Sequence, residues 1–384
     1  MKIRLPNAQG SSEIYQLQGE PIAIRKPRAP FNRIAFAAAH VVANPFSNAD
    51  PSGPPGIDWE RTLAYRRYLL DLGFGVAEAM DTSQRGMGLD WPSALELITR
   101  SLKEAGKRAP MIYCGCGTDH LHPAHARSLD DVVKAYLEQL HAIQKLDGRI
   151  ILMASRALVK VAKSPEDYVK VYSRVLAEAD HPVILHWLGE MFDPALQGYW
   201  GGNDFAQTMA TALSAIEANA GKVDGIKISL LDDAKEVVMR RRLPASVKMY
   251  SGDDFNYPDL IAGDGEGYSH ALLGIFDAIA PAASVALSGL AKGNLKTYHK
   301  LMGPTVPLSR LIFRAPTQYY KTGIVFLAWL NGHQDHFVMV GGAQAMRPLP
   351  YFTEIFRLAD QAGLLRDPDL AVKRMKQLLA IHGA

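Results

Sequence analysis

Short apolar runs alternate with longer amphipathic stretches along most of the chain. Short runs of this kind are typical of buried strands, and we count eight, at residues 34–42, 74–80, 111–116, 150–154, 183–188, 223–228, 247–250 and 267–272. The stretches between them place apolar residues three and four apart, which indicates helices with one buried face, at residues 58–70, 92–105, 130–144, 165–179, 205–219 and 232–241. The pattern predicts repeated strand–helix units.

Eight strands with helices between them favour a closed barrel over an open, doubly wound sheet. No Gly-x-Gly-x-x-Gly motif follows the first apolar run, as a dinucleotide-binding open sheet would require. The predicted fold class is therefore α/β, a (β/α)8 TIM barrel at residues 33–285. We expect an N-terminal extension at 1–32 that forms a hairpin from residues 14–17 and 21–24. A C-terminal helical region follows at 286–384, with helices at 295–301, 319–330 and 351–362.

Composition and charge narrow the class of protein. Apolar residues make up 48% of the 384 residues and charged residues 21%, which is the balance of a globular protein with a large core. The net charge is only +3 and the basic residues are dispersed, so we expect no nucleic-acid partner. Residues 1–13 lack the apolar core of a signal peptide, and no run approaches the roughly 18 apolar residues of a membrane span. We therefore expect a cytoplasmic protein with no membrane partner.

The two cysteines of the chain, Cys114 and Cys116, lie two positions apart in one predicted strand. Neighbours at this spacing do not have the geometry of a structural disulfide. A metal site would need more soft ligands at suitable spacing. We expect both cysteines to be reduced and buried, with no metal bound there.

A lysine ends the sixth predicted strand, at the end of the barrel where working groups of this fold lie. Strand alternation places Lys227 with Gly225 on one face, opposite Ile226 and Ile228. If the isoleucines face the helices, the lysine points into the barrel. There it would lose hydration, which favours a neutral amine that attacks a carbonyl and forms a Schiff base. A lysine that reaches solvent or pairs with a nearby aspartate fits the pattern equally well.

Other polar residues lie at the same strand ends. His186 shares a strand face with Ile184, and it is either a proton carrier near the lysine or a hydrogen-bonded core histidine. Residues 251–254 follow the seventh run with the spacing of a capping box, so we expect at least one of their carboxylates to cap a helix. The candidate substrate-binding residues are His40, Asp81, Thr82, Ser83, Ser251, Gly252 and Asp253.

Two further features have alternative interpretations. Several histidines and an aspartate, His40, Asp81, His120, His122 and His186, are potential ligands of a divalent metal in a barrel hydrolase or isomerase. Solvated loop histidines are the simpler interpretation of the segment 120–125. The long insertion at 189–202 is rich in aromatic residues and is either a lid over a sugar-like ligand, using Tyr199 and Trp200, or a subunit contact.

Two motifs resemble the dihydrodipicolinate synthase and N-acetylneuraminate lyase family. Residues 225–227 resemble the lysine motif of that family, and residues 251–254 resemble the signature that follows it, at a similar spacing. Weaker similarities occur at 44–46 with 56–58, at 114–117 and at 346–349, and the resemblance extends from about Arg33 to Leu364. It implies a Schiff-base barrel enzyme with no cofactor, and a homodimer or homotetramer.

Three positions depart from that family. Residues 81–85 occupy the place of its Gly-Thr-Thr-Gly-Glu loop, where only Thr82 and Ser83 are similar in kind. His186 stands where the family has a proton-relaying tyrosine, and Met191 lies near the place of an expected arginine. The segment 154–156 lacks a second tyrosine, which reaches across a subunit boundary in typical members. The resemblance therefore implies a divergent branch whose substrate is not aspartate semialdehyde.

These observations together predict a lyase, either an aldolase or a dehydratase. We expect a small keto acid or keto-sugar-derived substrate bound as an iminium on Lys227, with His186 moving protons. The alternatives are the metal-dependent barrel enzyme, which would need a divalent ion, and a noncatalytic barrel that kept the scaffold alone.

Overall fold

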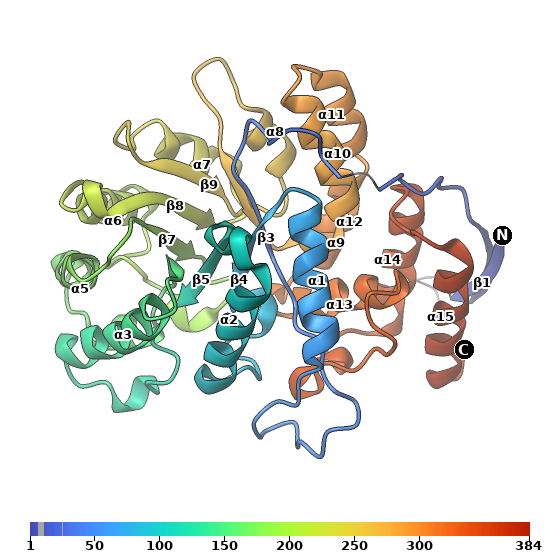
Figure 1. Cartoon of the computed structure of the whole chain (residues 1–384), viewed down its shortest axis with the longest axis horizontal. Helices are drawn as coiled ribbons and strands as arrows, with labels where there is room; N and C mark the ends of the chain where they lie inside the picture. The colour runs from blue at the N-terminus through green and yellow to red at the C-terminus, as the bar shows by residue number, and fades with distance from the viewer. Residues whose placement is uncertain (7–10, 25) are drawn as a thin grey trace.

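The structure is a computed structural model that describes residues 1–6, 11–24 and 26–384. Its larger part is a closed barrel of parallel strands (Figure 1). Around the barrel the strands follow the order β10-β3-β4-β5-β6-β7-β8-β9. Their bounds are β3 (Ala35–Ala38), β4 (Gly75–Glu78), β5 (Ile112–Cys116), β6 (Arg149–Leu152), β7 (Val183–Leu188), β8 (Val223–Ser229), β9 (Lys248–Ser251) and β10 (His270–Leu273). Each predicted apolar run overlaps one of them, and the predicted fold class is confirmed.

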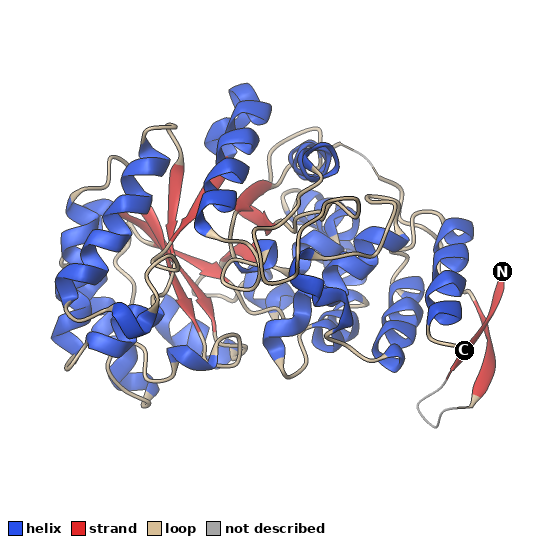
Figure 2. Cartoon of the chain, turned by 90° about the horizontal axis from the view of Figure 1, so that it is seen from below, coloured by secondary structure: helices blue, strands red, loops and turns tan. Residues whose placement is uncertain are grey.

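Helices surround the strands on the outer face of the barrel (Figure 2). The six that the periodicity predicts are α1 (Trp59–Asp71), α2 (Trp91–Ala105), α3 (Leu129–Gln144), α5 (Pro165–Ala177), α6 (Phe205–Glu217) and α7 (Asp233–Arg240). Three of these helices begin directly after an aspartate that caps them. Asp58, Asp90 and Asp204 accept backbone N–H bonds from the first turns of α1, α2 and α6. Three shorter helices have too few residues for a periodic signal, α4 (Arg156–Val161), α8 (Tyr257–Ala262) and α9 (Ile275–Ala278).

The C-terminal part is helical, as predicted. It contains α10 (Ala280–Leu290), α11 (Leu295–Met302), α12 (Thr305–Ile312), α13 (Tyr320–Leu330), α14 (Leu349–Gln361) and α15 (Pro368–Ile381). Every residue of α13 is buried, because it packs among α9, α12, α14 and α15. The boundary proposed at residue 285 falls inside α10, so one helix joins the barrel to this region.

The N-terminal extension does form a hairpin, and the predicted segment 14–17 largely coincides with one of its strands, but the other strand precedes it in the chain. It pairs β1 (Lys2–Pro6) with β2 (Ser12–Gln16) beside α14, and residues 21–24 are not a strand. The chain after β2 is instead fixed by the end of α14, since Gln18 and Gly19 donate backbone N–H bonds to the Asp360 carboxylate. Figure 1 shows the hairpin at the far end of the molecule from the barrel.

Two apolar clusters divide the barrel into an inside and an outside. The inner cluster contains Phe36, Ala77, Ile151, Ile184, Tyr250 and Leu272, one side chain from each of several strands. Ile226 and Ile228 belong to the outer cluster that packs against the helices. The alternation of β8 therefore directs Lys227 into the barrel. Gly225 faces inward as well, where an added Cβ would lie 2.6 Å from the ring of Tyr250.

Candidate active site

Lys227 lies inside the barrel near the C-terminal end of β8. Its side chain is 7% exposed, and among the described residues no carboxylate lies within ion-pair distance of its amine. Burial lowers the pKa of Lys227, while the negative charges of Asp254 and Asp81 oppose this shift. The position and its surroundings thus favour a neutral amine more than solvent would.

The loop after β9 shapes the space around this lysine. An added Cβ at Gly252 would lie 2.6 Å from Cε of Lys227 and 2.6 Å from the carbonyl oxygen of Ile228. Such distances are far shorter than real carbon contacts, so only glycine fits here without displacing the lysine or the strand. The role of Gly252 that the structure shows is therefore close packing against Lys227.

The two carboxylates that follow Gly252 differ in their contacts. Asp253 accepts backbone N–H bonds from Phe255 and Asn256, and it fixes the turn that leads into α8. Asp254 accepts the N–H of Ile275 beyond β10 at 2.8 Å and faces Lys227. Burial raises the pKa of Asp254 to about 7, although that N–H bond and the charge of Lys227 act in the opposite direction. Of these two carboxylates, Asp254 is the one whose charge acts on Lys227, and the sequence does not place it among the candidate site residues.

His186 lies beside Lys227, and the two are paired residues of β7 and β8. Its Nε2 forms a 3.2 Å hydrogen bond with Ser229 Oγ, and its buried Nδ1 has no partner among the described residues. Burial and the neighbouring charge of Lys227 lower the pKa of His186 well below its usual value. The imidazole is therefore neutral near pH 7, and its Nδ1 is free to form a hydrogen bond with a ligand.

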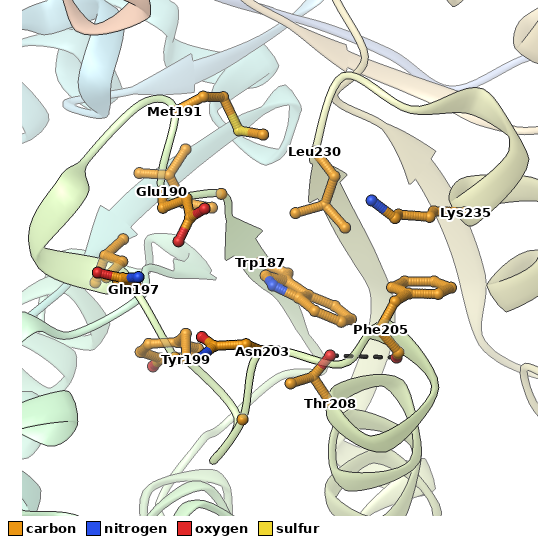
Figure 3. Close-up of a pocket in the computed structure, with 15 residues that line it drawn as sticks. Trp187, Glu190, Met191, Gln197, Tyr199, Asn203, Phe205, Thr208, Leu230 and Lys235 are labelled. Carbon is orange, nitrogen blue, oxygen red and sulfur yellow. Dashed lines mark hydrogen bonds between the residues drawn. The ribbon is translucent and has the colours of Figure 1, made fainter.

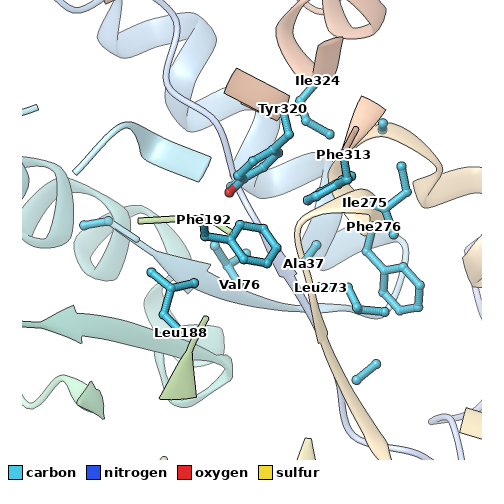
Figure 4. Close-up of a cluster of buried hydrophobic side chains, with 14 of the residues drawn as sticks. Ala37, Val76, Leu188, Phe192, Leu273, Ile275, Phe276, Phe313, Tyr320 and Ile324 are labelled. Carbon is cyan, nitrogen blue, oxygen red and sulfur yellow. The ribbon is translucent and has the colours of Figure 1, made fainter. Parts of the chain in front are cut away.

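A hydroxyl group of the loop after β4 meets a phenol hydroxyl from the C-terminal helices at the barrel mouth. Thr82 Oγ1 lies 2.8 Å from the phenol oxygen of Tyr320, the first residue of α13. The Tyr320 ring stacks on Phe313 with ring centroids 4.3 Å apart, and in Figure 4 its hydroxyl points away from α13 toward the barrel strands. Burial and the charge of Asp81 raise the pKa of Tyr320, so it is a neutral phenol. Ser83 donates its hydroxyl to the carbonyl oxygen of Ala39 at 2.6 Å.

Two predicted site residues have contacts away from Lys227. The Nδ1 of His40 lies 2.8 Å from the carboxylate of Asp277, which also accepts the backbone N–H of His40 and the hydroxyl of Tyr65. Ser251 Oγ accepts the N–H of Asp253 at 3.3 Å. The structure therefore brings Asp81 and His186 near Lys227 and pairs Thr82 with Tyr320, while His40, Ser83, Ser251 and Asp253 have hydrogen bonds within the scaffold.

A cavity of about 420 Å³ opens at the barrel mouth over β4, β5 and β6. Asp81 lines it together with Arg85, Thr118, Asp119, His122, Met153, Arg156 and Asp193. All three guanidinium nitrogen atoms of Arg85 donate hydrogen bonds within the protein, to Asp119, Gln139 and two backbone carbonyl groups. Arg156 donates only Nε–H to a described residue, to Asp193 at 2.5 Å.

The insertion at 189–202 packs its aromatic residues inward. Trp200 is fully buried and stacks on Tyr172, so it offers no face to a sugar or to another subunit. A separate cavity of about 400 Å³ lies between this insertion and the helices α6 and α7, with Trp187 and Phe205 stacked in its wall (Figure 3). Trp187 belongs to the outer cluster, so this cavity lies on the side of β7 opposite His186.

The histidines considered as metal ligands are dispersed in the structure. Among the described residues no group of three or more His, Cys, Asp or Glu has the geometry to hold a metal ion. His120 contacts Gln139, and His122 packs against His125. Cys114 and Cys116 are free and buried, as expected. No described helix is both long and apolar enough to span a membrane.

Comparison with known proteins shows the family and the fold of the chain. The family model described as a protein of unknown function (DUF993) matches residues 3–384. The chain belongs to this family. No curated protein matches the sequence of this DUF993 member.

Solved structures of the dihydrodipicolinate synthase family share its fold. The pyruvate complex of the Acinetobacter baumannii dihydrodipicolinate synthase has a TM-score of 0.63 and 16% identity, covering 86% of this chain and 99% of the other. YagE, a prophage protein of that family from E. coli K12, has a TM-score of 0.66 and 14% identity over 87% and 99% of the two chains. The Thermotoga maritima enzyme has a TM-score of 0.62 and 16% identity over 88% and 100%. The resemblance predicted from the sequence is confirmed at the level of fold.

Sequence reasoning missed Tyr320 and Asp254. The segment around Tyr320 was recognised only as a helix, and nothing local indicates that its first residue reaches Thr82. Asp254 was visible as the last residue of 251–254, but the capping-box spacing could not tell which carboxylate caps and which faces the lysine. The raised pKa of Asp254 is a signal that only the structure provides.

Proposed function

We propose that this protein is a Schiff-base-dependent lyase that binds a keto substrate covalently through Lys227. The observation that carries the proposal is the inward, buried position of Lys227 without an ion-pair partner among the described residues. A buried lysine of lowered pKa is the form of amine that attacks carbonyl groups. The location at the C-terminal ends of barrel strands agrees with where this fold places its chemistry.

The first step consumes a keto group and releases water. The lone pair of the Lys227 amine forms a bond to the carbonyl carbon. The carbonyl oxygen then takes up two protons, one released by the amine nitrogen and one from a general acid, and leaves as water as the nitrogen lone pair forms the C=N bond. The resulting iminium accepts the electron pair of a bond that breaks next to it. In an aldolase that bond is carbon–carbon, and a hydroxyl proton of the substrate leaves to a base. In a dehydratase a base takes the proton of the carbon beside the iminium. The enamine so formed expels the hydroxyl group of the next carbon, which takes up a proton from an acid and leaves as water.

Proton transfer in this scheme needs groups that reach the substrate above Lys227. His186 has an unpartnered Nδ1 and is neutral, so it can accept a proton without starting as a second cation beside the lysine. The paired hydroxyl groups of Thr82 and Tyr320 provide a second route from the barrel mouth. Asp254, with its pKa raised to about 7, is positioned to stabilise the iminium charge. We propose His186, Thr82 and Tyr320 as the proton-handling groups.

Borohydride trapping tests the proposal directly. The protein is incubated with a panel of keto acids and keto sugars, reduced with borohydride, and weighed by intact mass spectrometry, with peptide mapping to locate the adduct. We expect an adduct on Lys227 with at least one compound and none in Lys227→Met. Lys321→Met is the matched control, because Lys321 is a second buried lysine, with its pKa lowered to about 8 by burial. An adduct on Lys321 alone, or on no lysine with any compound, would contradict the mechanism.

A further inference from the structure

The cavity at the barrel mouth has an unused positive group at its outer edge. Arg156 begins α4, and its side chain is 45% exposed. Its Nε–H is bonded to Asp193 in the insertion, while its two terminal nitrogen atoms have no hydrogen-bond partner among the described residues. These nitrogen atoms lie near Gly86 in the loop after β4. A Cβ added at Gly86 would lie 3.8 and 3.9 Å from them, which is ordinary van der Waals distance. The guanidinium therefore extends between the loop after β4 and the insertion.

Apart from Arg156, the cavity is lined by the charged residues Arg85, Asp119, Asp193 and Asp81. Arg85 is paired with Asp119. Asp81 has no ion-pair partner among the described residues, and it raises the pKa of both Lys227 and Lys321 against the effect of burial. Lys321 bonds only the carbonyl oxygen of Gln318, with the sulfur of Met87 3.3 Å away. Asp81 therefore lines the cavity close enough to Lys227 and Lys321 for its charge to act on both amines, and Arg156 presents a free edge to the same cavity.

We propose that Arg156 binds an anionic group at the far end of the substrate, so that the substrate is a keto compound with a second acidic group. The proposal rests on the proposed function, because it assumes that the keto group is bound at Lys227. A guanidinium edge matches two oxygen atoms of a carboxylate or a phosphate. Asp81 lines the same cavity and its charge acts on Lys227, so it is suited to accept hydrogen bonds from hydroxyl groups of such a substrate.

The cavity that Arg156 and Asp81 line has room for a substrate of this kind. A cavity of about 420 Å³ is within the range of small-molecule sites and larger than a three-carbon keto acid needs. A carboxylate and a phosphate share the chemistry that Arg156 would recognise, so probes of both kinds distinguish them. Each anionic probe is compared with a partner that lacks only the distal charge. The pairs are 2-oxoglutarate with its 5-methyl ester, and a six-carbon 2-keto-3-deoxy sugar acid with and without a 6-phosphate.

The measurement is the rate of borohydride-trapped adduct formation on Lys227 at low probe concentration. We expect the full-length protein to react roughly 10- to 100-fold faster with one probe than with its partner that lacks the distal charge, as one charge-assisted contact provides. Arg156→Gln should remove this preference, so that the two probes of a pair react at similar rates. Arg174→Gln is the control, since Arg174 pairs with Asp130 on the outer helices and does not line the cavity.

A second variant separates anion binding from a purely structural role. Asp193→Asn breaks the same ion pair but leaves the guanidinium free, so we expect it to keep or increase the preference for the anionic probe. If Asp193→Asn and Arg156→Gln instead slow both probes of a pair equally, the ion pair only fastens the insertion, and the proposal is overturned. Equal rates for both members of every pair in the unmodified protein would also overturn it. Absence of any adduct on Lys227 would show that the proposed function itself is wrong.

Discussion

The hydroxyl groups of Thr82 and Tyr320 lie 2.8 Å apart, although 238 positions separate the two residues in the chain. The contact exists because α13 is buried among its neighbours and its first turn reaches the loop after β4. A helix outside the barrel thereby completes the barrel mouth with a neutral phenol. No second subunit is needed for this contact.

Removal of the phenol hydroxyl tests whether it carries protons. Tyr320→Phe keeps the ring that stacks on Phe313, so we expect the fold to be retained. Turnover should fall by about 10²- to 10⁴-fold, the usual effect of losing a general acid or base. Trapping of the Lys227 adduct should change far less, because that step needs only the amine. The measurement is kcat with a substrate found by trapping.

Thr82→Val is the matched variant, since it removes the partner hydroxyl at nearly constant volume. If the two hydroxyl groups act as one relay, the double variant should be no slower than Tyr320→Phe alone. Unchanged turnover in Tyr320→Phe would show that the phenol is only structural.

Gly252 is expected to tolerate no side chain. In Gly252→Ala the added Cβ would lie 2.6 Å from Lys227 Cε, so the lysine or the backbone near Ile228 must move. We expect a loss of about 1–3 kcal/mol in the free energy of unfolding, as for other overpacked sites, and loss of adduct formation on Lys227. Urea unfolding and borohydride trapping give the two values. Gly221→Ala is the control, because its Cβ would meet nothing within 4 Å. Full trapping in Gly252→Ala would mean that the lysine is not confined as the structure indicates.

The barrel was predictable because its signal is local and repeated. Each strand is a short apolar run, and the inward direction of Lys227 follows from alternation with Ile226 and Ile228. The hairpin was misplaced because residues 21–24 have strand-like composition, whereas the backbone just before them is held by Asp360 from the other end of the chain. A contact across more than 300 positions has no trace in local periodicity.

The site was predictable only in part for the same reason. Lys227 and His186 lie on adjacent strands, so the order of elements brings them together. Ser251 and Asp253 were expected to contact substrate, and the structure gives them hydrogen bonds within their own loop instead, while their contact with substrate stays a prediction. Tyr320 enters from a helix whose docking depends on its whole apolar surface. Such packing relationships cannot be derived from a motif.

The pH dependence of trapping should reflect Lys227 and Asp254 together. Only the neutral amine attacks, so the rate rises with pH through the lowered pKa of Lys227 and is lost below it. The negative charge of Asp254 raises the pKa of the lysine, so Asp254→Asn should move the midpoint of this profile to lower pH. Asn can still accept the N–H of Ile275, which keeps the loop in place. A midpoint that stays the same, or moves to higher pH, would show that Asp254 does not act on Lys227.

Glu236 offers a test of the structure that does not depend on catalysis. This α7 residue is buried, it accepts the hydroxyl of Ser269 at 2.6 Å, and its second oxygen has no partner among the described residues. Burial raises the pKa of Glu236 from 4.5 to about 8. The folded state therefore holds a proton that the unfolded state releases, so this group makes the protein progressively less stable as pH rises from about 4.5 to 8.

Glu236→Gln removes this dependence while keeping a carbonyl oxygen for Ser269. We expect the variant to gain stability relative to the unmodified protein across that window, by roughly one to a few kcal/mol at pH 9 and by little at pH 4.5. Urea unfolding at several pH values measures the difference, with the exposed Glu60→Gln as control. If the two proteins give parallel stability curves, Glu236 does not titrate as its burial requires. A gain in stability of Glu236→Gln that is largest at low pH would contradict the raised pKa of Glu236. A carboxylate with a lowered pKa stabilises the fold once it is ionised, whereas a buried carboxylate with a raised pKa destabilises the fold once it is ionised.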